Sequence, residues 1–522
     1  MLYIKKWQKI CKMHSAQILQ IIKKTIALAG LCLLTVNDLF AHPVAEPGKP
    51  NIIYIYADDM GYAELGCYGQ QKIKTPNIDR LAKEGIRFTQ HYTSTPVCAP
   101  ARCMLLTGRN GGHSYIRGNY ELGDFPDSLE GGQMPLPEGT YTIGHMFQGA
   151  GYITGAIGKW GLGMVNTTGA PNKQGFDYFF GYIDQKQAHN YYPTHLWEND
   201  KPYPLNNPPF SVHPKVNKTL SDDGFASFIG KEYAPDVMTL KAKEFIKTNK
   251  DKPFFLYLPY TIPHVSLQIP PGSKAYKMYE GKFDSIPYYA EKGYTPNKEP
   301  LAAYAAMITQ LDMYVGEIME QIKQLGLDKN TIIMFSSDNG TTFNGGVNAK
   351  FFNSVDGLRG LKMDVFEGGI REPFIARWPG KIPAGKVTDM ISVQFDMMAT
   401  FADLIGIKAP KNDGLSLKPT LLGNSAAQKQ HEYLYFEYPE KGGQVAIRLG
   451  DWKGVKIHVK KSGYKNTPWM LFNLKEDRGE TKNLAAQHPE LIKRFDAIVE
   501  KEHQPAHIKE WEFINPKFPM EK

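Results

Sequence analysis

A cysteine just before a run of helix-forming residues is the first group in this sequence that could do covalent chemistry. Cys98 is followed by Pro100 and Arg102, and the segment continues with the sequence Cys-Met-Leu-Leu-Thr-Gly-Arg. Because proline suits the first turn of a helix, we expect Cys98 at a helix amino terminus, where free N–H groups and the helix dipole attract an anion. Taken alone, the pattern is equally typical of a buried structural thiol beside a salt-bridged arginine.

Oxygen-rich side chains follow two predicted strands. Residues 52–57 form a β-branched and aromatic run that ends in Asp58 and Asp59, and residues 331–335 form a similar run that leads to Asp338 and Asn339. Three carboxylates and one amide are ligands that a hard divalent cation prefers. One acidic pair is more often a cap or a solvated turn, but two pairs at two strand ends favour a metal site. No Cys/His cluster with zinc spacing occurs in the sequence, which favours calcium.

The segment around Cys98 resembles the signature of the type I sulfatases, a family of the alkaline phosphatase superfamily: Cys-x-Pro-x-Arg followed by Leu-Thr-Gly-Arg. In that family the cysteine is oxidised to formylglycine, so the resemblance implies that a maturation enzyme converts Cys98. Ala101 stands where most members have serine, while the cysteine, proline and arginine are present. A hydrated aldehyde has one hydroxyl that can attack sulfur and a second that can expel sulfate. The resemblance therefore implies a sulfuric ester hydrolase.

Further family elements follow in the expected order. Residues 158–163 resemble the Gly-Lys-Trp-His-Leu-Gly element, Pro263-His264 resembles the Pro-His element, and residues 359–371 resemble the segment that carries a lysine. By this resemblance, Arg102 stabilises the hydrated aldehyde, and Lys159 and Lys362 hold sulfate oxygens in the transition state. His264 is the candidate general acid toward the leaving alcohol.

The resemblance also defines a metal site with one calcium ion. It assigns the ion to four side chains and to the oxygen of modified Cys98: Asp58, Asp59, Asp338 and Asn339. Asp338 could also take the proton from the attacking hydroxyl.

Gly161 is the departure with a chemical consequence. The family commonly has a second histidine at this position, which assists the elimination step, and here that role is vacant. His189 or His113 could supply an imidazole from elsewhere in the chain. Either could equally contact substrate or be structural.

The substrate is expected to be a sulfated carbohydrate, such as a galactose or N-acetylgalactosamine unit of a glycan. The segment Gln187–Trp197 carries Tyr191, Tyr192, His195 and Trp197, a mixture suited to sugar rings. Packing beneath a loop is an equal alternative for these side chains. Two other functions stay open: a phosphomonoester or phosphonate hydrolase on the same scaffold, and a non-catalytic glycan-binding relative.

Strands that alternate with helices predict an α/β core. The expected strands include residues 52–57, 254–258 and 331–335, and the expected helices include 77–84 and 302–325. The resemblance implies an alkaline phosphatase-like core, a large mixed sheet flanked by helices, at residues 42–420. Three short runs past residue 430 predict an antiparallel sheet in a smaller α+β domain at residues 421–522. Residues 195–235 show no sustained period and are predicted to form a surface insertion.

The amino terminus has the pattern of a signal peptide over residues 1–41. Six lysines precede an apolar run at residues 25–36, which is shorter than the roughly 20 residues that span a bilayer. We expect export to the periplasm and no membrane span in the mature chain; secretion and lipid anchoring are alternatives. Without the leader, basic residues fall from 61 to 55 and acidic residues from 53 to 52, a net charge of +3. This balance gives no argument for nucleic acid binding. Cys67 and Cys103 remain as a pair that could form a disulfide.

Overall fold

The computed structural model describes residues 49–123, 125–126, 129–216 and 219–515. From Pro50 onward, the chain forms one compact unit. The signal peptide predicted at residues 1–41 lies outside the described residues, and the domain boundary predicted at 420/421 stays a prediction. Within the described ranges, every helix is either too short or too polar to cross a lipid bilayer.

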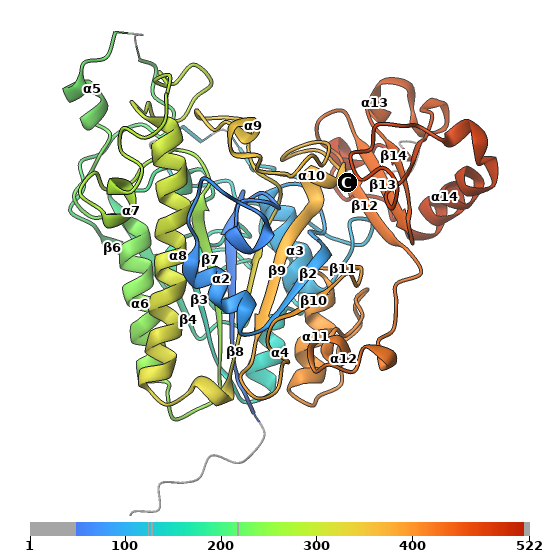
Figure 1. Ribbon diagram of the computed structural model, residues 1–522, viewed down its shortest axis with the longest axis horizontal. Coiled ribbons are helices and arrows are strands. Elements are labelled where there is room, and N and C mark those ends of the chain that lie inside the picture. Colours follow the sequence, from blue (N-terminus) through green and yellow to red (C-terminus); the bar gives the residue numbers. More distant parts are fainter. Residues whose placement is uncertain (1–48, 124, 127–128, 217–218, 516–522) are drawn as a thin grey trace, which may run out of the picture. The chain divides into compact units, whose positions relative to one another are not determined.

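An eleven-stranded mixed sheet forms the centre of this unit, as predicted (Figure 1). The order is β10-β2-β9-β8-β1-β7-β3-β4-β5-β6, and β11 pairs with β2. The five strands from β8 to β4 are parallel, whereas β9 runs antiparallel to both β8 and β2. The strands are β1 (Asn51–Asp58), β2 (Ile86–Tyr92), β3 (Ile153–Lys159), β4 (Tyr178–Tyr182), β5 (His195–Glu198), β6 (Lys201–Pro204), β7 (Phe254–Pro263), β8 (Thr331–Ser337), β9 (Arg371–Arg377), β10 (Lys386–Thr388) and β11 (Ser392–Val393).

Strand β1 shows why the core strands are apolar throughout. Ile53 and Ile55 pack into the hydrophobic core on one face of the sheet, while Tyr54 and Tyr56 pack into the core on the other face. A parallel strand that is covered on both faces needs apolar side chains at odd and even positions alike. The unbroken run at residues 52–57 is therefore the signature of a central strand.

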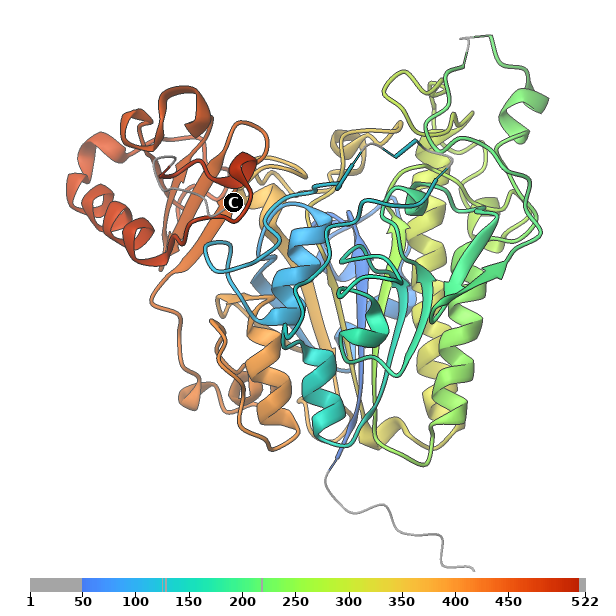
Figure 2. The same ribbon diagram turned by 180° about the vertical axis from the view of Figure 1, so that it is seen from behind.

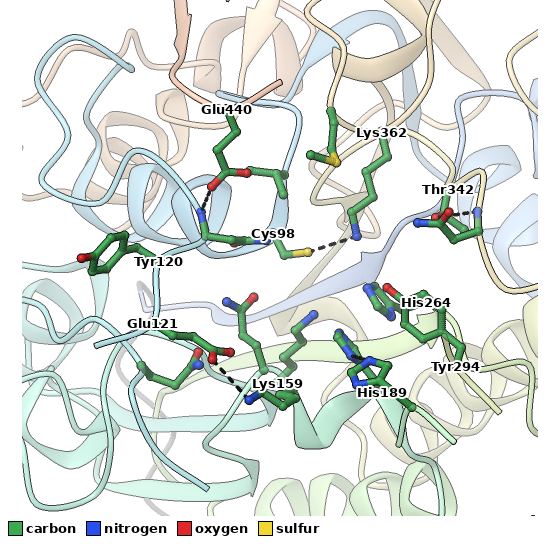
Figure 3. A pocket seen from close by; sticks show the side chains of 18 of the residues that line it. Cys98, Tyr120, Glu121, Lys159, His189, His264, Tyr294, Thr342, Lys362 and Glu440 are labelled. Carbon is green, nitrogen blue, oxygen red and sulfur yellow. Dashed lines mark hydrogen bonds and ion pairs between the residues drawn. The ribbon is translucent and has the colours of Figure 1, made fainter. Parts of the chain in front are cut away.

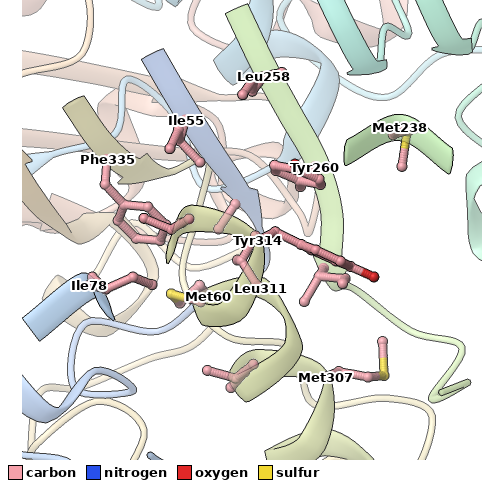
Figure 4. Close-up of a cluster of buried hydrophobic side chains, with 14 of the residues drawn as sticks. Ile55, Met60, Ile78, Met238, Leu258, Tyr260, Met307, Leu311, Tyr314 and Phe335 are labelled. Atoms are coloured by element: carbon pink, nitrogen blue, oxygen red, sulfur yellow. The ribbon is translucent and has the colours of Figure 1, made fainter. Parts of the chain in front are cut away.

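Helices cover both faces of the sheet. Figure 1 looks onto the face of α2 (Pro76–Lys83), α6 (Ala234–Thr248) and α8 (Pro300–Gln324), and Figure 2 looks from behind onto α3 (Cys98–Thr107) and α4 (Ile143–Gly149). Helix α11 (Asp396–Leu404) packs in the same core as α3 and α4. Figure 4 shows the α8 side of the core, where the rings of Tyr260 and Tyr314 stack with centroids 5.7 Å apart. The helices predicted at 77–84 and 302–325 are confirmed.

Short helices lie in the connections between these elements. They are α5 (Asp222–Ala226), α7 (Lys274–Lys277), α9 (Ala349–Phe352), α10 (Glu367–Ile370), α12 (Lys418–Leu421) and α13 (Val459–Ser462).

A second, antiparallel sheet follows, with the order β12 (Leu434–Tyr438), β13 (Gln444–Leu449), β14 (Trp452–Lys456) and β15 (Met470–Asn473). The predicted meander is confirmed. One face packs against Phe495 and Val499 of α14 (Pro489–Glu502), and the other face contributes Phe436 and Val455 to the hydrophobic cluster that contains Cys98. The carboxyl-terminal sheet therefore supports the helix start on which Cys98 lies.

A buried ion-pair network reinforces this contact between the two sheets. Lys453 of β14 lies 2.9 Å from Glu367 of α10 and 3.0 Å from Glu480, and all three side chains are fully buried. Glu367 also pairs with Arg371 at 3.3 Å. A buried charge without its partner is strongly destabilising, so these residues depend on one another.

Residues 195–235, predicted to form a surface insertion because they show no sustained period, do contain regular elements. This segment contains the hairpin of β5 and β6, the short helix α5 and the start of α6. The sequence pattern does not predict this hairpin because β6 carries Pro202 and Pro204, which weaken a strand pattern. Strand β6 ends the sheet order, where an unpaired backbone edge tolerates proline.

Candidate active site

Cys98 begins helix α3, as the sequence predicted. The helix runs from Cys98 to Thr107 and is capped by Gly108, whose φ of 66° is the left-handed conformation that glycine adopts most readily. Cys98 is only 2% exposed, and the Nζ atom of Lys362 lies 3.4 Å from its Sγ atom. The described cysteines Cys67, Cys98 and Cys103 are free thiols, so a disulfide between Cys67 and Cys103 is not formed.

The predicted oxygen ligands meet at the carboxyl ends of two adjacent strands. Strands β1 and β8 are parallel neighbours in which Ala57 pairs with Ser337, so the residues after them emerge side by side. The backbone N–H of Asp59 donates to Oδ1 of Asp338 at 3.1 Å, and Nδ2 of Asn339 donates to Oδ1 of Asp59 at 2.7 Å. Asp59 holds this position with φ of 65°, a conformation that is uncommon outside glycine and is concentrated at functional sites.

Three cations face these carboxylates. Lys159 Nζ lies 2.8 Å from Oδ2 of Asp58, and Lys362 Nζ lies 2.7 Å from Oδ1 of Asp59. Nη2 of Arg102 lies 2.8 Å from Oδ2 of Asp338. Three buried carboxylates are thus matched by three cations, each of which comes from a distant part of the chain.

The donor set fits a divalent cation. Ligand atoms of Asp58, Asp59, Cys98 and His264 all lie within 4.8 Å of one another. Among the described residues, Oδ1 of Asp58 and Oδ1 of Asn339 are buried oxygens with no hydrogen-bond partner. Buried acceptors are almost always satisfied, so two orphan oxygens in one cluster indicate a missing electropositive partner. His264 joins this cluster although the sequence did not mark it as a ligand, and its Nε2 lies 3.6 Å from Asp59.

Burial and charge shift the pKa values of the site in different directions. Burial raises the pKa of the Cys98 thiol to about 11, and the nearby lysines offset this only in part. Burial opposes ionisation of Asp58, but the charge of Lys159 outweighs it and holds the pKa of Asp58 well below its usual range. For Asp338, burial and the charge of Asp58 raise the pKa. An unmodified Cys98 is consequently a protonated thiol at neutral pH, a poor nucleophile.

His264 is neutral before substrate enters. Burial, together with the charge of Lys362, lowers the pKa of His264 to about 4. Nδ1 contacts the carbonyl oxygen of Val265, which leaves Nε2 directed toward Asp59. The imidazole can therefore act as an acid only when a bound anion raises its pKa.

A cavity of about 460 Å³ opens onto Cys98. Figure 3 shows Cys98, Lys159, His264 and Lys362 converging on one space from different sides. The cavity wall also includes Gln185, and Arg102 is 1% exposed among the carboxylates. The structure thus brings together all the residues predicted for the site.

The two histidines considered for the vacant role at Gly161 lie in different surroundings. His189 lines the cavity, and its ring stacks on that of His264 with centroids 4.8 Å apart. His113 instead lies 2.8 Å from Asp413, in a separate group of polar residues. Of the two, only His189 is positioned to contact a ligand in this cavity.

Sugar stacking by Tyr191 and Tyr192 is wrong. The two tyrosines are 0% and 1% exposed, and the hydroxyl of Tyr191 donates to the carbonyl oxygen of His264 at 2.7 Å. Trp197 donates from Nε1 to Glu130 at 2.8 Å. Packing beneath a loop is the interpretation that the structure supports for these side chains.

Sequence reasoning missed several residues of the cavity wall, among them His213, Tyr294 and Glu440. His213 Nε2 lies 3.1 Å from Nδ1 of His189, and the ring of Tyr294 packs edge-on against both imidazoles. They come from connections without periodic patterns, so no spacing signal in one sequence could have identified them.

Comparison with known proteins identifies the family. A family model described as sulfatase matches residues 50–407, and a model described as N-sulphoglucosamine sulphohydrolase, C-terminal, matches residues 361–504. The chain is 31% identical to an N-acetylgalactosamine-6-O-sulfatase of Bacteroides thetaiotaomicron, over 87% of this chain and 93% of that protein. It is also 31% identical to arylsulfatase A of Homo sapiens, over 87% of each chain.

A solved structure agrees with these matches. The crystal structure of Ps i-CgsB in complex with k-i-k-neocarrahexaose aligns with a TM-score of 0.70 at 29% identity, covering 91% of this chain and 95% of that one. Family models, relatives and fold point to the same group of hydrolases. The protein is a member of the sulfatase family, within the alkaline phosphatase-like superfamily, and a sulfate ester hydrolase.

Proposed function

We propose that this sulfatase removes sulfate from carbohydrates, with a galactose or N-acetylgalactosamine unit as the sulfated sugar, and that its nucleophile is a formylglycine made from Cys98. The observation that carries the proposal is the cationic cavity around Cys98, where Lys362 lies 3.4 Å from Sγ and Lys159 lines the same space. The sugar preference is supported by the Bacteroides relative, which is named for N-acetylgalactosamine 6-sulfate, and by the carrageenan oligosaccharide bound to Ps i-CgsB.

The first task of the site is to bind a sulfate group. Lys159 and Lys362 present two ammonium groups to the cavity, and the amino terminus of α3 adds its dipole. As negative charge shifts onto the sulfate oxygens, these fixed cations stabilise it without reorganisation. A calcium ion held by Asp58, Asp59, Asp338 and Asn339 would add positive charge at the same oxygens.

The second task is to move protons. A hydrated aldehyde at position 98 supplies one hydroxyl to attack sulfur and another whose deprotonation re-forms the carbonyl and releases sulfate. By the family resemblance, Asp338 accepts a proton there, and the guanidinium of Arg102 orients its carboxylate at 2.8 Å. His264 gives a proton to the departing alcohol oxygen once the sulfate anion has raised its pKa.

The proposal is tested by measuring sulfate release from a panel of sulfated mono- and disaccharides. We expect turnover of sulfated galactose or N-acetylgalactosamine, and no turnover by the Cys98→Ala variant with its fold intact. Matched phosphate esters are assayed in parallel, because phosphate release far above sulfate release would favour the phosphoesterase alternative. A correctly matured, calcium-loaded protein that only binds these sugars would favour the glycan-binding alternative.

Export to the periplasm belongs to the same proposal. The lysine-rich start and the short apolar run of residues 1–41 support export. An enzyme that acts on polymeric glycans also encounters its substrate outside the cytoplasm. Fractionation of the native cell, with amino-terminal sequencing of the mature protein, tests it. A start near residue 42 is the expected result, and an uncleaved chain in the cytoplasmic fraction would contradict it.

A further inference from the structure

The space beside Gly161 is filled by another residue. Gly161 has φ of 76°, and a Cβ atom built on it would lie 2.5 Å from Cγ and 2.9 Å from Cδ of Gln185. Such distances are too short for any real side chain. Gln185 therefore occupies the volume that a side chain at position 161 would need.

The fold explains how the two residues meet. Gly161 follows β3 and Gln185 follows β4, which are parallel neighbours in which Lys159 pairs with Tyr182. The pairing continues past both strand ends, because the N–H of Gly161 donates to the carbonyl oxygen of Ile183 at 3.3 Å. Both residues thus emerge at the edge of the sheet where the sulfate site lies.

The amide of Gln185 is not satisfied by the protein. Its Oε1 is buried and has no hydrogen-bond partner among the described residues, and the side chain lines the same cavity as Cys98, Lys159 and Lys362. Leaving a buried acceptor without a hydrogen bond is energetically unfavourable. At the wall of a ligand cavity, such an atom is explained most simply by a donor that arrives with the ligand.

We infer that Oε1 of Gln185 accepts a hydrogen bond from a hydroxyl group present only in the loaded site. A carbonyl oxygen repels sulfate oxygens, so the partner must be a hydrogen-bond donor rather than the sulfate itself. Hydroxyl groups are the donors that a hydrated aldehyde and a sugar have in common. Two sources carry this chemistry: the hydrated aldehyde at position 98 and a sugar hydroxyl close to the sulfate ester. The inference rests on the proposed function.

The experiment compares two variants of Gln185 on two substrates. Gln185→Met keeps the length of the side chain and removes the acceptor, whereas Gln185→Glu keeps an acceptor oxygen but adds a negative charge that repels the sulfate. The substrates are 4-nitrophenyl sulfate, which has no hydroxyl, and N-acetylgalactosamine 6-sulfate. We expect Gln185→Met to lower kcat/KM about tenfold, the effect of one hydrogen bond, and Gln185→Glu to lower it further on both substrates, because its carboxylate repels the sulfate ester.

The pattern across substrates identifies the donor. A fall in kcat on both substrates assigns the bond to the hydrate at position 98, whereas a fall confined to the sugar, mainly in KM, assigns it to a substrate hydroxyl. Gln174→Met is the matched control, because Oε1 of Gln174 is also buried without a partner among the described residues but Gln174 does not line the catalytic cavity. We expect its kinetics to match wild type.

Two results overturn the inference. One is wild-type kinetics of Gln185→Met on both substrates, and the other is wild-type kinetics of Gln185→Glu, which would place the side chain away from the sulfate. Melting temperature and the mass of the peptide containing residue 98 are recorded for each variant, so that misfolding or failed maturation is detected. A wild-type protein inactive on both substrates would refute the proposed function instead.

Discussion

Calcium removal is expected to destabilise the folded protein measurably. Without an ion, the buried Oδ1 atoms of Asp58 and Asn339 have no hydrogen-bond partner among the described residues, and three carboxylates crowd one sheet edge. An ion that binds only the folded state at about 100 times its dissociation constant raises the free energy of unfolding by about 2.7 kcal/mol. For a chain of this length, that corresponds to roughly 3 °C in Tm.

The assay is thermal unfolding in EDTA and in excess calcium, at a fixed scan rate. Asn339→Ala removes one oxygen ligand and should shrink the calcium increment to below about 1 °C, since ligand number sets calcium affinity. Asp312→Asn is the matched control: its carboxylate is fully buried but accepts from the N–H groups of Asn77 and Ile78, outside the site. The Asp312→Asn substitution should lower Tm, but the rise in Tm caused by calcium should stay the same as in wild type. An unchanged increment in Asn339→Ala, or none in wild type, would refute the metal assignment.

Three further outcomes are expected. Lys453→Met removes the cation beside buried Glu480 and one of the cations beside buried Glu367, so the free energy of unfolding should fall by about 3–5 kcal/mol in urea titrations, and an unchanged midpoint would contradict this. Burial opposes protonation of His503, yet its hydrogen bond to Glu437 and the adjacent carboxylate of Glu512 raise its pKa to about 9. The pKa of His503 in the folded state lies above its value of about 6.5 in the unfolded state, so protonated His503 stabilises the fold. This contribution to the free energy of unfolding is complete below about pH 6.5 and is lost as the pH rises through 9. It amounts to at most about 3 kcal/mol, and to roughly half of that after solvent screening. His503→Ala should therefore flatten the stability profile across that window. Lys362→Met should lower kcat/KM for sulfate release by about 100- to 1,000-fold, and a loss below about tenfold would exclude direct contact with the sulfate.

The cluster of carboxylates that follows β1 and β8 could be predicted because local sequence patterns determine its position. A buried parallel strand reads as an apolar run, and the residues that follow adjacent strands must share one edge of the sheet. Asp59 and Asp338 are 279 residues apart, yet their hydrogen bond follows from this rule once β1 and β8 are recognised. The resemblance then added Lys159, His264 and Lys362, which spacing alone would not have selected.

The rest of the cavity wall could not be predicted in the same way. Gln185 and His213 lie in irregular connections, and their positions depend on tertiary contacts rather than on periodicity. Tyr191 shows the converse error, because an aromatic cluster suited to sugars is buried by its hydrogen bonds to backbone carbonyls. The ion pairs of Lys453 are equally invisible in the sequence, since its partners lie 86 and 27 residues away.

The most direct test of the account is the mass of the tryptic peptide Phe88–Arg102, in which Cys98 is the only cysteine. In protein made with a formylglycine-generating enzyme, this peptide should be about 18 Da lighter than the thiol form. Across preparations, sulfate release from the sugar should rise in proportion to the lighter fraction. Full activity in a preparation that contains only the thiol, or none in one that is fully converted and calcium-loaded, would contradict the account.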